Sequence, residues 1–178
     1  KLDSALAMFE PVETELPCTY NLEIRHEALD DFNGDGKDDA LLRKDQGRWF
    51  IYLMDGASVI DQGSPLLTRN PDLSLQTTAD FSGDGNADLL IRHADGRWFL
   101  HELDGLSVIA SGQPQLSRHP GMGIVDVADL DFDGKADLLM RRPDGPWNIC
   151  LMDGTQVRER AWPDMVRSDK WVAVEDID

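Results

Sequence analysis

Positive charge, cysteine and long apolar runs are all scarce in this sequence of 178 residues. Lysine and arginine number 17 against 34 aspartates and glutamates, and the resulting net charge of −17 excludes nucleic acid as a partner because it repels phosphate groups. No apolar run approaches the roughly 18 residues that a membrane span needs, so we expect no membrane-spanning helix. Cys18 and Cys150 are too few for a disulfide framework; a single bridge and two unpaired thiols both remain open.

What the sequence does contain is a repeat of 49 residues. The runs DFNGDGKDDALL, DFSGDGNADLLI and DLDFDGKADLLM begin at Asp31, Asp80 and Asp129, which are separated by 49 residues each time. Most of the excess negative charge therefore lies in three equivalent places. The same step relates further residues: Trp49, Trp98 and Trp147; Arg43, Arg92 and Arg141; Arg69, Arg118 and Arg167.

Each repeat has the composition of four short β-strands. In the second repeat, residues 87–92, 97–103 and 106–110 are apolar segments separated by Asp-Gly pairs, and GIVDVAD leads into the next acidic run. Helical periodicity is absent. Four short antiparallel strands per 40–50 residues are typical of a propeller blade. We therefore predict an all-β protein with about three and a half four-stranded β-propeller blades, forming part of a larger propeller or one closed by oligomerisation.

The spacing also predicts how the chain is divided. Residues 1–21 form an N-terminal segment, either a partial blade or a linker. Residues 22–178 form the propeller repeats, with blades at 22–70, 71–119 and 120–168 and a partial blade at 169–178.

The acidic runs share the form D-x-[DNS]-x-D-G-x-x-D, in which side-chain oxygens at alternate positions converge when the loop wraps around an ion. Glycine at position 6 permits the sharp turn, and several anionic oxygens in a flexible loop favour Ca²⁺ over Mg²⁺. We predict three calcium sites and a truncated fourth. The predicted ligands, including the backbone carbonyl at position 7, are Asp31, Asn33, Asp35, Lys37 and Asp39; Asp80, Ser82, Asp84, Asn86 and Asp88; Asp129, Asp131, Asp133, Lys135 and Asp137; and, in the truncated site, Asp176 and Asp178.

The pattern does not fit an EF-hand, which needs a glutamate at position 12, where this chain has Leu42, Ile91 and Met140. An apolar strand follows each run, so the loop should join two strands of a hairpin. The sites are not expected to be equal. The third has four carboxylates, whereas the second has only the hydroxyl of Ser82 at position 3 and should be the weakest.

The recurring tryptophans and arginines each allow two interpretations. The tryptophans are expected to pack one blade against the next, the alternative being a platform for a ligand. Arg43, Arg92 and Arg141 are expected to pair with Asp55, Asp104 and Asp153, or else to line a site for an anion or a sugar.

The runs DFNGDGKDDALL and DFSGDGNADLLI resemble the FG-GAP or VCBS repeats of integrin-α-like β-propellers, and the later W-F-x-x-x-(L/M)-D-G element resembles a bacterial variant of that family. The resemblance covers residues from about 22 to 178. It implies calcium in the hairpin between the first two strands of each blade and a secreted or cell-surface location, extracellular or periplasmic. Family propellers usually have about seven blades. We therefore expect the remainder of a parent chain, or further copies of this chain, to complete the ring.

No G-x-S-x-G or H-E-x-x-H motif is present, and the four histidines have no metal-binding spacing. The chain is therefore predicted to be a non-catalytic, calcium-binding scaffold for adhesion, with an extracellular protein or glycan as partner. One alternative is a lectin with sugar pockets between blades, near Arg69 and Arg118. Another is an accessory domain of a larger secreted enzyme.

Overall fold

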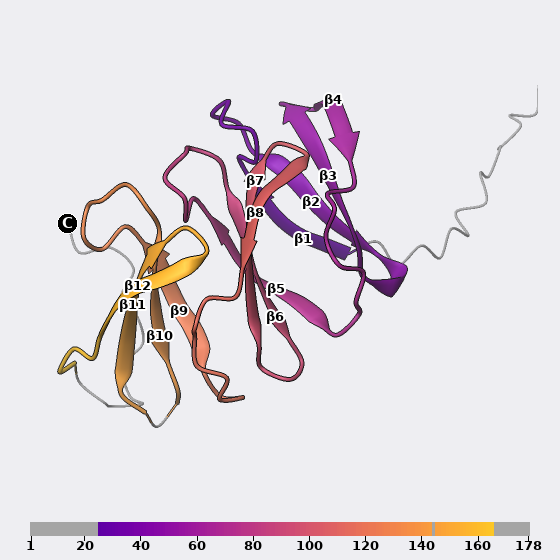
Figure 1. Cartoon of the computed structure of the whole chain (residues 1–178). Helices are drawn as coiled ribbons and strands as arrows, with labels where there is room; N and C mark the ends of the chain where they lie inside the picture. The colour runs from indigo at the N-terminus through magenta and orange to yellow at the C-terminus, as the bar shows by residue number, and fades with distance from the viewer. Residues whose placement is uncertain (1–24, 144, 166–178) are drawn as a thin grey trace, which may run out of the picture.

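The computed structural model describes residues 25–143 and 145–165, which form three four-stranded antiparallel sheets, each with its strands in sequence order (Figure 1). The first sheet contains β1 (Arg25–Asp30), β2 (Asp39–Lys44), β3 (Arg48–Asp55) and β4 (Ser58–Gly63). The second contains β5 (Leu73–Ala79), β6 (Asp88–His93), β7 (Trp98–Asp104) and β8 (Ser107–Gly112). The third contains β9 (Gly123–Ala128), β10 (Asp137–Arg141), β11 (Trp147–Asp153) and β12 (Gln156–Ala161).

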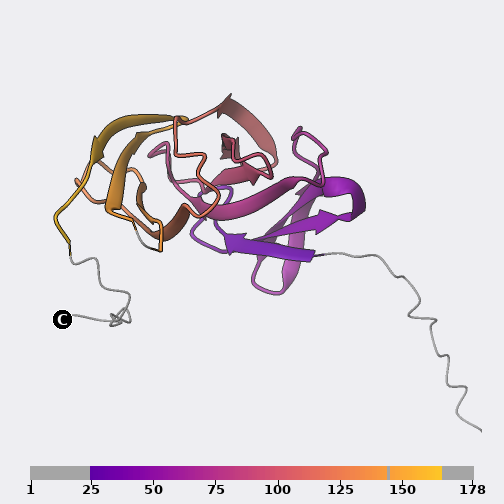
Figure 2. The same cartoon turned by 90° about the horizontal axis from the view of Figure 1, so that it is seen from below.

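Each sheet is one propeller blade, so the predicted all-β fold is confirmed. A 3-10 turn, η1 (Asp45–Gly47), joins β2 to β3. Within the described part of the chain the sheets do not close into a ring. The predicted N-terminal segment 1–21 and the partial blade 169–178 lie outside the described residues. Seen from below, the three sheets follow one another, with the first and third at opposite ends (Figure 2).

The burial of each strand follows from its place between blades. On β3, Trp49, Ile51 and Leu53 are buried and alternate with more exposed residues, as in a strand with one covered face. On β6, by contrast, Leu89 and Leu90 are both fully buried. They belong to different hydrophobic clusters, one on each side of the middle blade. A continuous apolar run is therefore the signature of a strand that is covered on both faces.

The two clusters hold neighbouring blades together. The first packs Phe32 and Trp49 of blade one against Leu103 of blade two, and the second packs Phe81 and Trp98 against the third blade. Cys150 is buried in the second cluster, where its Sγ lies 2.9 Å from Oδ1 of Asn148. Cys18 lies outside the described residues, so a bridge between the two stays a prediction.

Hydrogen bonds between blades are accepted at the start of the first and of the second acidic loop. The carbonyls of Asp31 and Phe32 accept the N–H groups of Ala87 and Gly105 at 2.7 and 2.8 Å. In the same way, the carbonyls of Asp80 and Phe81 accept the N–H groups of Ala136 and Gly154 from blade three. The acidic loops are thus built into the blade junctions.

Every blade also has a β-bulge where its outermost strand pairs with the third strand. In blade one, Leu53 pairs with Asp61 and Met54 with Val59, which leaves Ile60 without a partner in the register. The unpaired residue is Ile109 in blade two and Arg158 in blade three. A bulge redirects the side chain of its extra residue, so this position can aim a group away from the strand.

Candidate metal centre

The three acidic loops connect the first and second strands of their blades, at residues 31–38, 80–87 and 129–136. Their position-6 glycines, Gly36, Gly85 and Gly134, have φ values of 80°, 89° and 86°, in the region that glycine adopts without steric cost. The turn geometry expected from the sequence is therefore present in all three loops.

The first aspartate of each loop organises the backbone around itself. Asp31 accepts the N–H groups of Gly34 and Gly36, both at 2.7 Å. In loop two, Asp80 accepts the corresponding bonds from Gly83 and Gly85 at 2.6 and 2.8 Å. In loop three, Asp129 accepts the N–H of Gly134 at 2.9 Å. These bonds curl the backbone of each loop around its first aspartate.

Positions 3 and 5 are held by short-range bonds. In loop one, Asn33 Oδ1 accepts the N–H of Asp35 at 3.0 Å, and Asp35 Oδ1 accepts the N–H of Lys37 at 2.9 Å. Asp84 and Asp133 accept the equivalent N–H at 2.8 and 3.0 Å. Each of these bonds uses one carboxylate oxygen. The other oxygen of Asp84 remains able to bind a cation, whereas Oδ2 of Asp35 lies 3.6 Å from Lys37 Nζ and Oδ2 of Asp133 accepts a hydrogen bond from Arg158.

The aspartate at position 9 has a structural role that the sequence pattern did not reveal. Asp39, Asp88 and Asp137 are completely buried. The two carboxylate oxygens of Asp39 accept the N–H groups of Phe32 in the loop and Met54 in β3, at 3.0 and 2.7 Å. The carboxylate therefore ties the loop to the third strand of its own blade.

Burial also changes the protonation of these carboxylates. Desolvation raises the pKa of Asp39 and of Asp137 above the usual range, and it raises the pKa of Asp88 to about 7. The backbone N–H groups that they accept act in the opposite direction, because they stabilise the ionised form. A divalent cation at the loop would likewise favour the ionised form.

The third loop gathers carboxylates closely enough to hold a metal ion. Ligand atoms of Asp129, Asp131 and Asp137 all lie within 4.8 Å of one another, the only such cluster among the residues that the structure describes. Loops one and two have the same fold, with the neutral Asn33 and Ser82 in place of Asp131. These oxygen donors fit the hard-ligand chemistry of Ca²⁺. Metal ligation by the residues of all three loops stays a prediction, and Asp176 and Asp178 lie outside the described residues.

The expected pairing of arginines with Asp55, Asp104 and Asp153 is wrong. Asp55 contacts Lys37 Nζ at 3.3 Å, and Asp153 forms an ion pair with Lys135. The lysine at position 7 of loops one and three thus reaches from the loop to the last residue of the third strand. Arg92 instead donates to the carbonyls of His119 and Met122, at 2.7 and 2.8 Å. Those carbonyls lie in the linker between blades two and three, outside the reach of local sequence patterns.

The guanidinium groups also lie over the recurring tryptophans, at 4.8 Å for Arg43 over Trp49 and for Arg92 over Trp98. Trp49 and Trp98 are 1% and 2% exposed, so the core interpretation holds and the ligand-platform interpretation fails for these two residues. Each arginine and tryptophan pair forms part of a blade junction, because the tryptophan belongs to an inter-blade cluster and the guanidinium lies over its ring.

Three four-stranded blades, each with an acidic turn between its first two strands, define the molecule as a protein built from propeller-type repeats. The family profile described as FG-GAP-like repeat matches residues 31–91 and 80–140. The chain belongs to this family. FG-GAP repeats in general are non-catalytic scaffold modules, often bind calcium and are typical of extracellular or surface proteins.

Neither the comparison with curated proteins nor the comparison with solved structures gave a match. In the described part of the chain, no helix has the length and apolar character required to cross a membrane.

Proposed function

We propose that this chain is a calcium-binding, non-catalytic β-propeller module of a secreted or surface protein, and that it presents a rigid scaffold for adhesion or for recognition of proteins or glycans. The observation that carries the proposal is the convergence of Asp129, Asp131 and Asp137 in the turn between β9 and β10. The same turn, with the same hydrogen bonds to its first aspartate, recurs in the other two blades.

In this proposal calcium stabilises the fold and takes no part in a reaction. Each loop has at least three carboxylates at its predicted ligand positions, and their mutual repulsion is relieved when a divalent cation binds between them. Because loops one and two also accept hydrogen bonds from the next blade, an ordered loop there orders the junction. At free calcium about twenty times the dissociation constant, each site stabilises the fold by about 1.8 kcal/mol. The millimolar calcium outside cells matches the weak affinity of extracellular calcium modules, about 10⁻⁴ to 10⁻³ M.

The test is thermal unfolding of the whole chain in calcium, in magnesium and in chelator. We expect calcium to raise the melting temperature and magnesium at the same concentration to raise it far less. Asp129→Asn should reduce the calcium-induced shift, whereas Asp126→Asn, an exposed control on β9, should leave it unchanged. Superimposable melting curves in calcium and chelator would contradict the proposal.

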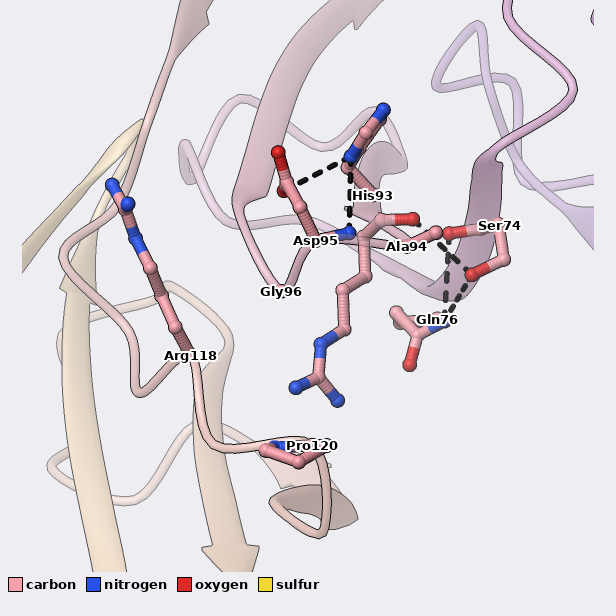
Figure 3. A pocket seen from close by; sticks show the side chains of 9 residues that line it. Ser74, Gln76, His93, Ala94, Asp95, Gly96, Arg118 and Pro120 are labelled. Atoms are coloured by element: carbon pink, nitrogen blue, oxygen red, sulfur yellow. Dashed lines mark hydrogen bonds and ion pairs between the residues drawn. The ribbon is translucent and has the colours of Figure 1, made fainter.

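A glycan-binding role is the second candidate, and a cavity of 480 Å³ between blade two and the linker that follows it favours it. Ser74 and Gln76 on β5 line one side, and Arg118 and Pro120 of the linker line the other (Figure 3). Arg118 is exposed, and its guanidinium could donate to sugar hydroxyls or carboxylates. The recurring tryptophan does not line the cavity.

A glycan array, run with and without chelator, separates glycan binding from protein adhesion. If the cavity binds sugar, Arg118→Gln should weaken the signal. Arg48→Gln, at an exposed arginine of blade one that does not line the cavity, should not. The absence of any glycan signal in calcium would leave protein adhesion as the only supported form of the proposal.

A further inference from the structure

Blade three differs from the other two at its bulge. Arg158, the residue without a register partner on β12, donates from Nη1 to Asp133 Oδ2 at 2.9 Å and forms an ion pair through Nη2 with Asp131. The equivalent bulge residues, Ile60 and Ile109, are apolar and more than half exposed. Blade three thus has a cationic side chain where the other blades have an exposed isoleucine. The bulge directs the Arg158 side chain over the acidic loop.

A second difference lies in the loop that Arg158 reaches. Asp131 stands at position 3, where loops one and two have Asn33 and Ser82. Loop three therefore has four carboxylates and the others have three, and the guanidinium binds the additional one. Counting only the carboxylates at the predicted ligand positions, loop three with Arg158 carries −3, which equals the −3 of the three ligand carboxylates in each of the other loops.

The geometry places the guanidinium and a calcium ion in competition. Asp131 is one of the three residues whose ligand atoms converge, and Arg158 contacts both this carboxylate and its neighbour Asp133. A carboxylate oxygen held by a guanidinium is a poorer metal ligand, and a positive charge at hydrogen-bonding distance repels a divalent cation. The side chains of Arg158, Asp131 and Asp133 are 43%, 28% and 24% exposed, so the arginine can swing into solvent.

Blades one and two offer no equivalent among the described ion pairs. In loop one, Lys37 contacts Asp35 at 3.6 Å, but it belongs to the loop itself and also contacts Asp55. In loop two, position 7 is Asn86, and no basic side chain forms an ion pair with the loop in the described structure. Competition from an outer strand is therefore specific to blade three.

We propose that Arg158 is a built-in counter-ion of the third loop, which keeps the loop ordered without calcium and lowers its calcium affinity below that expected from four carboxylates. This inference rests on calcium binding by the loops. It makes blade three the least calcium-dependent blade and loop three the site whose occupancy requires a side chain to be displaced.

The test follows each loop separately in a calcium titration of the whole chain, by NMR of the amides of Gly36, Gly85 and Gly134, each of which donates to the first aspartate of its loop. Arg158→Ile introduces the residue type of the other blades. It should lower the calcium dissociation constant of loop three by roughly three- to tenfold and leave those of loops one and two within about twofold of wild type. Arg158→Lys keeps the charge but loses the bidentate contact. Its loop-three calcium affinity should lie between those of wild type and Arg158→Ile.

The matched control is Arg160→Gln, which removes the same charge from β12 and introduces the residue type found at position 62 of blade one. This variant should leave the calcium dissociation constant of loop three within about twofold of the wild-type value. In chelator, Arg158→Ile should melt about 2–4 °C lower than wild type because the four carboxylates lose their counter-ion.

The outcomes separate this inference from the proposed function. If all three amides respond to calcium and Arg158→Ile binds no more tightly, or if Arg160→Gln gives the same gain, the inference is overturned while the function stands. If Gly134 alone fails to respond in every variant, loop three is not a calcium site and the inference is wrong. If none of the three amides responds, the proposed function fails, and the inference fails with it.

Discussion

The carboxylate of Asp88 accepts the backbone N–H of Leu103 at 3.0 Å and, through its other oxygen, the N–H of Phe81 at 2.9 Å. One buried side chain thus joins an acidic loop to the third strand of its blade. A residue predicted from the sequence only as a metal ligand thus has a structural role, because it links two segments of its blade.

Asp88→Asn should destabilise the chain even without calcium, because an amide has one acceptor oxygen and presents N–H groups where the backbone also presents N–H groups. We expect a loss of about 2–3 kcal/mol in the free energy of unfolding, measured by denaturant titration in chelator. Asp84→Asn is the control, since Asp84 is exposed and an asparagine oxygen can still accept the N–H of Asn86. Equal losses in the two variants would show that Asp88 has no separate structural role.

Arg92→Leu should weaken the junction between blades two and three. The substitution removes two hydrogen bonds to linker carbonyls and the contact with the face of Trp98, for an expected loss of about 2–3 kcal/mol. Arg97→Leu removes an exposed ion pair with Asp95 and should cost less than about 1 kcal/mol. Denaturant titration compares the two, and similar losses would argue against the junction role.

Phe132→Gly should be tolerated although it removes an aromatic ring. Phe132 has a φ of 61° and is 92% exposed, at the loop position occupied by Gly34 and Gly83 in the other blades. Relief of the left-handed conformation offsets the flexibility that glycine adds to the unfolded chain, so stability should change by less than about 1 kcal/mol. Phe81→Ala, in contrast, opens a cavity in the second cluster and should cost about 3–5 kcal/mol. A large loss in Phe132→Gly would mean that the ring is buried against something.

His101 should make stability depend on pH. Burial lowers the pKa of His101 below its ordinary value of 6.5, so the unfolded chain binds the proton more readily than the folded chain. The free energy of unfolding should therefore fall as the pH drops below about 6.5 and level off below the folded pKa. Tyr52 occupies the equivalent position in blade one, which makes His101→Tyr the natural comparison.

The measurement is the difference in unfolding free energy between wild type and His101→Tyr from pH 8 to pH 5, since acidic groups common to both cancel. We expect a constant difference above pH 7 and a relative gain for the tyrosine variant below pH 6.5. A difference that does not change across this range would contradict the assignment.

Local patterns correctly predicted the strands and the turns. The acidic runs end at the first residue of β2, β6 and β10, and the apolar segment before Asp104-Gly105 became β7. These predictions succeed because alternating burial and left-handed glycines are properties of a few adjacent residues. The arginine pairings failed because Arg92 binds carbonyls 27 and 30 residues away, in a linker whose path depends on how two blades pack.

The sequence by itself determined the 49-residue repeat, the four strands of each blade and the positions of the acidic turns, since these follow from short-range alternation and turn chemistry. Only the tertiary structure decided that Asp39, Asp88 and Asp137 are buried ties and that Arg158 lies over the third loop. Their surroundings come from strands and loops that are distant in sequence, and the cost of burying a charge is set by the groups that surround it.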